Sequence, residues 1–130
     1  MMTSGNILLL DDEPSIRDLV ADVLAEGGHR VRVCESPEQV LDAADLDPAT
    51  LAVVDFWGQS HQELAAEERA EVLRLAQAVP TVLVTARTWA RDEMVDALGL
   101  RALIRKPFDV DELATVVNEA LDSRRRGGMA

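Results

Sequence analysis

The stretch ILLLDDEP at residues 7–14 decides the fold of this chain. An unbroken apolar run such as residues 7–10 is typical of a strand buried on both faces of a sheet. Pro14 then favours a helix that begins at this point, because proline fits the first helical position. Gly27 and Gly28 are expected to end that helix. Its apolar face follows helical spacing and comprises Ile16, Leu19, Val20, Val23 and Leu24.

The same alternation of short apolar segments and helical patterns continues along the chain. Strands are expected at residues 6–10, 30–34, 51–55, 81–85 and 102–105. The second of these alternates, with Val31 and Val33 on one side, which predicts an edge strand. The later helices are marked by a capping box at 36–39, an Ala- and Glu-rich segment at 63–78, the residues Ala90, Met94, Ala97 and Leu98 before Gly99, and the caps Asp109 and Glu112. Five strand–helix units predict a parallel sheet with helices on both faces.

Length and charge restrict the class of protein. The chain has 130 residues, which fits a single domain, 1–130, with a core at about residues 6–123 and a basic, glycine-containing tail at 124–130. Its formal net charge is -11, from 24 acidic and 13 basic side chains, which disfavours direct nucleic-acid binding. No apolar run is long enough to span a membrane, and the first five residues lack a secretory pattern. Cys34 is the only cysteine, which suits a cytoplasmic location.

Polar residues of a particular kind follow four of the five predicted strands. In chain order they are Asp11, Asp12 and Glu13, then Asp55, then Thr85, then Lys106. Ligands of open parallel sheets bind beyond the carboxyl ends of the strands, so these side chains are expected to converge there. Taken singly, each has an ordinary interpretation: a helix cap, a turn residue, a strand terminator or a solvated lysine.

Taken together, these residues predict a site for a metal ion and a phosphoryl group. Neighbouring carboxylates repel one another, and Lys106 offsets only part of their charge. A hard divalent cation with oxygen ligands offsets the remainder, and Mg²⁺ is suited to a few carboxylates together with phosphate oxygens. A hydroxyl at Thr85 and an ammonium at Lys106 are suitable donors to a phosphoryl group. A carboxylate nucleophile in this setting yields an aspartyl phosphate.

The chain resembles the receiver domain of two-component response regulators over almost its whole length. The motifs that carry the resemblance are LLLDDEP at 8–14, VVD at 53–55, VLVTA at 82–86 and IRKPF at 104–108. The resemblance implies a flavodoxin-like (βα)5 three-layer sandwich, with a five-stranded parallel sheet in the order 2-1-3-4-5.

The resemblance also implies a role for each residue of the site. Asp55 would be the phosphoacceptor, Thr85 and Lys106 would contact the phosphoryl oxygens, and the Lys106–Pro107 bond would be cis. The implied ligands of Mg²⁺ (or Mn²⁺) are Asp11, Asp12, Asp55 and the backbone carbonyl of Trp57. A histidine kinase or phosphotransfer protein would supply the phosphoryl group, and an effector protein would receive the signal. A homodimer through the last two helices and the fifth strand is a further expectation.

The sequence departs from the family pattern at two places. The loop after Asp55 reads FWGQSH at 56–61, where the family usually has Met-Pro followed by Gly. The position of the family's switch aromatic, three residues before Lys106, is Leu103. These departures motivate an alternative, a pseudo-receiver that binds proteins without being phosphorylated. His61 could position water near Asp55, although a solvated loop residue is the more ordinary interpretation, and Trp57 and Trp89 could form a partner surface or pack locally.

A separate enzymatic activity is not expected. A phosphatase that uses Asp55 as its nucleophile is chemically permitted, since fold does not fix function. The chain, however, has no room for a domain that would select a substrate.

Overall fold

The computed structural model describes residues 5–11, 13–46, 51–55, 66–85, 93–105 and 108–129, with the backbone alone described at 46, 68, 93, 94 and 122–129. Strands and helices alternate within these ranges. The strands are β1 (Asn6–Asp11), β2 (Arg30–Cys34), β3 (Leu51–Asp55), β4 (Thr81–Thr85) and β5 (Ala102–Arg105). The helices are α1 (Pro14–Glu26), α2 (Pro37–Leu46), α3 (Ala66–Ala78), α4 (Glu93–Leu98) and α5 (Val110–Met129).

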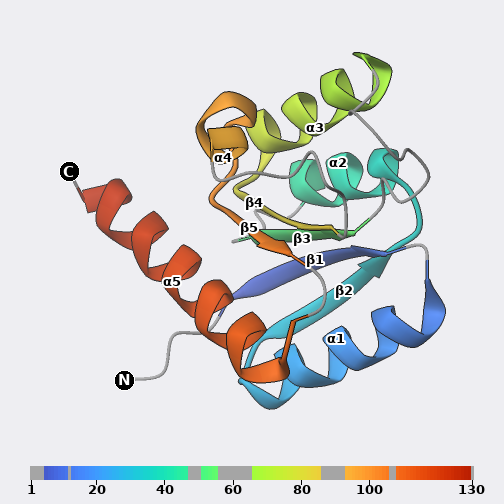
Figure 1. Ribbon diagram of the computed structural model, residues 1–130, viewed down its shortest axis with the longest axis vertical. Coiled ribbons are helices and arrows are strands. Elements are labelled where there is room, and N and C mark those ends of the chain that lie inside the picture. The colour runs from blue at the N-terminus through green and yellow to red at the C-terminus, as the bar shows by residue number, and fades with distance from the viewer. Residues whose placement is uncertain are drawn as a thin grey trace.

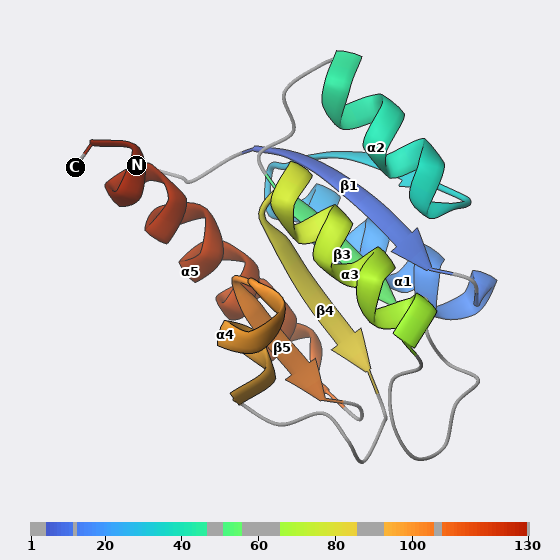
Figure 2. The same cartoon turned by 90° about the horizontal axis from the view of Figure 1, so that it is seen from above.

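The strands form one parallel sheet in the order β2-β1-β3-β4-β5, which confirms the predicted topology. Helices α2, α3 and α4 cover one face of the sheet, and α1 and α5 cover the other (Figure 1). Seen from above, the strands run in a common direction, so their carboxyl ends share one edge of the sheet (Figure 2). β2 lies at the outer edge with a mostly exposed burial pattern, as its alternating sequence predicts.

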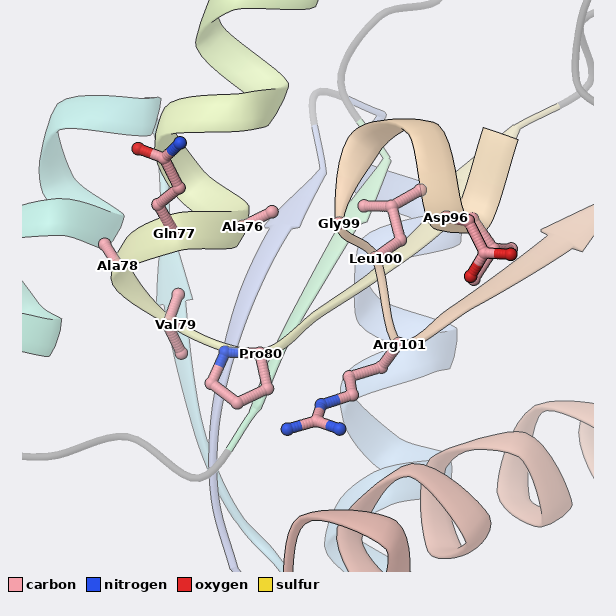
Figure 3. Close-up of a pocket in the computed structure, with 10 residues that line it drawn as sticks. Ala76, Gln77, Ala78, Val79, Pro80, Asp96, Gly99, Leu100 and Arg101 are labelled. Atoms are coloured by element: carbon pink, nitrogen blue, oxygen red, sulfur yellow. The ribbon is translucent and has the colours of Figure 1, made fainter. Parts of the chain in front are cut away.

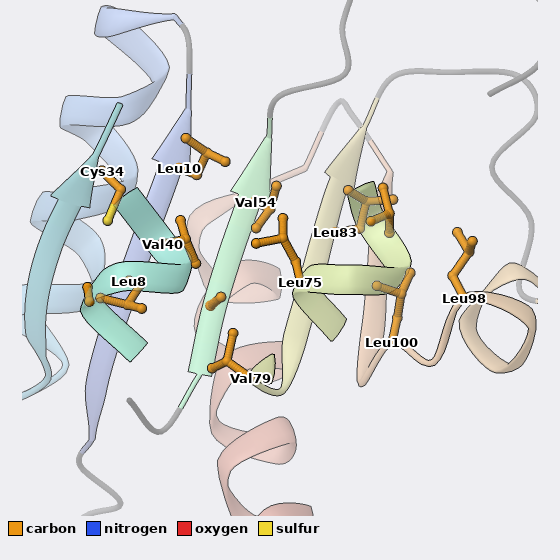
Figure 4. Close-up of a cluster of buried hydrophobic side chains, with 13 residues drawn as sticks. Leu8, Leu10, Cys34, Val40, Val54, Leu75, Val79, Leu83, Leu98 and Leu100 are labelled. Carbon is orange, nitrogen blue, oxygen red and sulfur yellow. The ribbon is translucent and has the colours of Figure 1, made fainter. Parts of the chain in front are cut away.

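Each face of the sheet carries its own hydrophobic cluster. Leu8 and Val54 belong to the cluster under α2, α3 and α4 (Figure 4). Leu9 and Val53, their direct neighbours in sequence, belong to the cluster under α1 and α5. Burying one such side chain contributes roughly 1.5–3 kcal/mol, and a shift of one residue would exchange the two sets. The apolar residues of β1 and β3 therefore fix the register of these strands.

Leu19 and Ala97, two residues of the predicted helical patterns, are exposed. Helical spacing puts Leu19 on the apolar face of α1, yet its side chain is 48% exposed, whereas Val20 and Leu24 are buried. A helix on a sheet presents only a stripe of its surface, and Leu19 lies outside that stripe. In the short helix α4, Ala97 is exposed and Val95 packs against the core.

Element boundaries differ from the sequence-based ones at a few points. β1 includes Asp11, one residue beyond the predicted strand. α3 begins at Ala66 in the described part of the chain, and the expected start at residues 63–65 lies outside it, as does Ala90. α5 continues through 124–129, the stretch that the sequence assigns to a tail. Neither α5 nor any other described helix has the length and apolar character needed to cross a membrane.

The helix ends follow the chemistry expected from the sequence. Ser36 Oγ accepts the N–H of Gln39 at 3.2 Å, and Gln39 Oε1 accepts the N–H of Glu35 at 2.8 Å. The capping box of α2 is thus present, with its return bond made to the residue before the cap. Asp109 Oδ1 accepts the N–H of Glu112 at 2.7 Å at the start of α5. Gly27 and Gly28 follow α1, Gly99 follows α4, and the positive φ angles of Gly28 and Gly99 suit glycine.

Candidate functional site

Two carboxylate residues lie side by side where β1 and β3 end. Asp11 is the last residue of β1, Asp55 is the last residue of β3, and the two are register partners across the parallel ladder. Their exposed fractions are only 3% and 8%. The four residues before each of them are buried and apolar, so the side-by-side placement follows from the packing of both strands.

This placement has an electrostatic consequence. Adjacent parallel strands are roughly 5 Å apart, so two buried carboxylates in register repel each other strongly when both are ionised. Burying charge is costly unless a partner of opposite sign compensates for it. The carboxyl edge of β1 and β3 therefore favours a cation.

Asp11 also shapes the turn into α1. Its Oδ1 accepts the backbone N–H of Glu13 at 2.9 Å, which is the geometry of an Asx turn. Glu13 occupies the N-cap of α1 and its side chain makes no capping hydrogen bond. Glu13 therefore does not cap the helix through its side chain, so the ordinary interpretation is wrong for this residue. For Asp11, the bond to the Glu13 N–H accounts for only one of the two carboxylate oxygens. The turn fixes the orientation of the Asp11 carboxylate at the end of the strand.

Thr85 lies at the same edge of the sheet. It is the last residue of β4 and is 5% exposed. Val54 of β3 is in register with Leu83 of β4, so Thr85 stands one residue beyond the level of Asp55. A hydroxyl at this position borders the space beyond the carboxyl end of β3, where a group attached to Asp55 would lie.

Arg105 is a neighbour of the site that the sequence did not single out. It is the last residue of β5, it is the register partner of Thr85, and it is exposed. Its only signal in the sequence is its place directly before Lys106. The register thus sets a guanidinium residue beside the hydroxyl residue, which adds positive charge to this end of the sheet.

Several predicted site residues lie outside the described part of the chain. They are Asp12, Trp57, His61, Trp89 and the Lys106–Pro107 pair. Leu103, at the expected position of a switch aromatic, is described: it is partly buried and packs against the cluster under α2, α3 and α4. It is also the register partner of Leu83 in β4.

The described residues carry part of the predicted metal site. Asp11 and Asp55 supply carboxylate oxygens, which hard cations such as Mg²⁺ prefer. Among the described residues, no group of three or more His, Cys, Asp or Glu side chains is placed to hold a metal. The third predicted carboxylate, Asp12, is not among those residues. The donor set that is described fits a hard divalent cation in its chemistry.

A cavity of about 450 Å³ lies at the other end of the sheet, away from these residues. It is formed by the ends of α3 and α4 together with the segments that lead into β4 and β5 (Figure 3). Pro80 and Leu100 line it, with Gln77, Asp96 and Arg101 as its polar residues. It shares no residue with the carboxyl edge.

Comparisons with known proteins agree with this arrangement, although no protein-family model matches the chain. The chain is 30% identical to the sensory transduction protein RegX3 of Mycobacterium tuberculosis, over 98% of this chain and 53% of that protein. It is 29% identical to the nitrogen assimilation regulatory protein NtrX of Azorhizobium caulinodans, over 92% of this chain and 27% of that protein. The chain thus spans between about a quarter and a half of the length of these relatives.

A solved structure of similar size extends the comparison to the fold. The receiver domain of NtrX from Brucella abortus matches with a TM-score of 0.73 and 28% identity, over 89% of this chain and 98% of that structure. The likeness therefore covers a whole domain of the same architecture.

Proposed function

This chain belongs to the receiver domains of response regulators, and from that premise we propose that it is a phosphoryl-accepting signalling switch in a two-component phosphorelay. Asp55 is the phosphoacceptor, and the reaction depends on Mg²⁺ or Mn²⁺. The observation that carries the proposal is the register pairing of buried Asp11 and Asp55 at the carboxyl edge of the sheet. Such a pair holds a cation next to a carboxylate nucleophile.

Each side chain has a distinct task in the proposed reaction. An oxygen of Asp55 forms a bond to phosphorus while the P–N bond of a phosphohistidine donor breaks, and the released imidazole takes up a proton. Asp11, Asp12 and the Trp57 carbonyl would join Asp55 in holding the metal. The metal, when bound, would neutralise charge on the phosphoryl oxygens. Thr85 and Lys106 donate hydrogen bonds to those oxygens. These bonds stabilise the negative charge on the transferring phosphoryl group.

The proposed partners follow from the same chemistry. A histidine kinase or a phosphotransfer protein supplies the phosphoryl group in the cytoplasm, and an effector protein reads the phosphorylated form. The face formed by α4, β5 and α5 is the proposed surface for the effector or for a homodimer. The formal net charge of -11 argues against direct contact with nucleic acid or an anionic membrane surface.

We further propose that the domain acts as a switch and not as an enzyme on a separate substrate. The domain turns over only its own aspartyl phosphate. Steady hydrolysis of a general phosphatase substrate such as p-nitrophenyl phosphate, abolished in Asp55→Asn, would overturn this part of the proposal.

Mass spectrometry tests the switch directly. Incubation with acetyl phosphate and Mg²⁺ should add one phosphoryl group to the protein, and none when a chelator removes the metal. Asp55→Asn should abolish the addition, whereas Asp45→Asn, at an exposed position on α2, should leave it unchanged. An unmodified mass in the wild type, or a modified mass in Asp55→Asn, contradicts the assignment of Asp55.

Leu103 supports a second candidate, a module that binds proteins without phosphorylation. Leu103 packs against the cluster under α2, α3 and α4. Its side chain has no polar group that could form a hydrogen bond when Thr85, on the adjacent strand, changes position. Trp89→Phe leaves Trp57 as the only tryptophan, so its fluorescence reports on the predicted metal site. Fluorescence that does not respond to millimolar Mg²⁺, together with an unmodified mass, would favour the docking module.

A further inference from the structure

The outer edge of β2 has the features of a docking strand for another polypeptide. β2 is the terminal strand of the sheet and pairs only with β1 in the described part of the chain. It forms the edge of the sheet opposite to β5, with β1, β3 and β4 between the two. A terminal strand presents backbone N–H and C=O groups along its outer side, which a further strand can use.

Two arginines stand on one face of this strand. In the register with β1, Arg30 is the partner of Asn6 and Arg32 is the partner of Leu8. Leu8 belongs to the cluster under α2, α3 and α4. Both arginines therefore stand on the α2 face, spaced roughly 7 Å apart as residues i and i+2 of a strand. Both are exposed, and neither forms an ion pair with a residue that the structure describes.

This lack of ion pairs is notable in so acidic a chain. The formal net charge is -11, yet neither Arg30 nor Arg32 is paired with any of the carboxylates that the structure describes. The two arginines line a small hollow of about 160 Å³ together with Ala43 of α2. A hollow of this volume has room for the end of a carboxylate side chain but is smaller than typical sites for nucleotides or other drug-sized ligands.

The other face of β2 is apolar. Val33 is 43% exposed and is one of the few large hydrophobic side chains exposed among the described residues, and Val31 beside it is partly buried. The N–H of Arg30 points inward, since it donates to the carbonyl of Gly5 at 3.0 Å. In a strand of a parallel sheet, the N–H and C=O groups of one residue point to one side, and those of the next residue point to the other side. Val31 and Val33 therefore turn their N–H and C=O groups outward, away from β1.

We propose that an acidic, extended segment of a partner protein adds to the β2 edge as a sixth strand. Its backbone pairs with Val31 and Val33. Its carboxylates, at alternate positions, pair with Arg30 and Arg32 on the α2 face. Its intervening apolar residues cover Val33 on the α1 face. The partner segment thus has an alternating pattern of acidic and β-branched residues.

Charge selects this partner over a second copy of the chain. Pairing β2 with the β2 of another copy would bring four arginines together along one edge, and like charges that face each other across strands are destabilising. Glu35 follows the strand and is exposed, so it disfavours an acidic residue at that end. The partner's acids are therefore expected opposite the amino-terminal half of β2.

A synthetic peptide of about six residues with the pattern Glu-Val-Glu-Val tests this proposal. Isothermal titration calorimetry with the full chain should detect binding that weakens with added salt, since exposed ion pairs are screened. Arg30→Glu/Arg32→Glu should weaken binding by about tenfold or more, whereas Arg74→Glu on α3, also exposed, should not. A peptide with Lys in place of Glu should not bind.

Hydrogen exchange separates strand addition from simple charge attraction. The amides of Val31 and Val33 should exchange rapidly in the free protein and become protected with the peptide bound. Val33→Pro removes one outward N–H at a position where an edge strand tolerates proline, and it should abolish binding while the circular dichroism spectrum stays unchanged. Binding without protection of these amides would overturn the proposal, as would no binding at all. In the second case the arginines serve only to prevent edge-to-edge aggregation.

Discussion

Asp11 and Asp55 face each other in register as the last residues of two adjacent parallel strands, and both are more than nine-tenths buried. Each strand is held by buried apolar residues that have no part in the chemistry. The fold thus forces two carboxylates together at a cost that a bound cation would relieve.

Neutralising Asp11 should stabilise the metal-free protein. Asp11→Asn removes the repulsion but keeps an oxygen that can accept the Glu13 N–H. We expect the free energy of unfolding without Mg²⁺ to rise by about 1 kcal/mol in urea titrations. At saturating Mg²⁺ the wild type should gain about 2 kcal/mol, and the variant much less. Equal stabilisation of both proteins by Mg²⁺ would show that Asp11 is not a ligand, and Asp45→Asn is the matched control.

Thr85 should connect the phosphoryl site to β5. Thr85→Val removes the hydroxyl and preserves the shape of the side chain at a buried strand end. Phosphorylation of Asp55 should persist, whereas the NMR shift of the Arg105 amide on addition of Mg²⁺ and beryllofluoride should disappear. Arg105 is the relevant probe because it is the register partner of Thr85. Thr85→Ser, which keeps the hydroxyl, should retain the shift; loss of it in both variants would point to packing instead.

Stability should decrease at alkaline pH because of Cys34. Burial raises the pKa of its thiol above the ordinary value of 9.0, and the positive charge of Arg32 opposes this only partly. Below pH 9 the thiol is protonated in both states, so it has no effect on stability. Above pH 9 the thiol ionises more readily in the unfolded chain, so the free energy of unfolding falls, by at most about 1.4 kcal/mol per pH unit.

Urea titrations between about pH 8 and pH 10.5 measure this decrease. The sequence contains no tyrosine and only one lysine, Lys106, so few other groups titrate in the same range. Cys34→Ala should flatten the dependence on pH, although it lowers stability at every pH by creating a cavity. An equally steep dependence in Cys34→Ala would assign the effect to another group.

Gly99 should be needed for its backbone conformation and not for its small size. Its φ is +70°, and an added Cβ would meet only Ala76 Cβ at an ordinary 3.9 Å. The turn is closed by the Leu100 N–H, which donates to the Val95 carbonyl at 2.8 Å. Gly99→Ala should cost about 1 kcal/mol in thermal or urea unfolding, and Gly99→Asn should cost less. An equal loss in both variants would indicate a steric cause.

The sequence by itself determined the strands, it implied their order through the family resemblance, and it placed Asp11 and Asp55 among the candidate site residues. Runs such as residues 51–54 are apolar throughout, and only a strand covered on both faces buries such a run. The caps at Ser36 and Asp109 and the glycine at 99 are local signals, because their hydrogen bonds join residues close in sequence. Local rules failed at Leu19, where the spacing is helical but the sheet does not reach the side chain.

Only the tertiary structure decided which side chains lie next to one another. Nothing in the sequence says that Asp11 and Asp55 share a register or that Arg105 stands beside Thr85, since both pairings join strands that are distant in the chain. The exposed arginines on the edge of β2 are likewise ordinary in the sequence and become distinctive when the sheet ends there. Apolar patterning is a property of neighbouring residues, whereas register results from the simultaneous packing of both faces of the sheet.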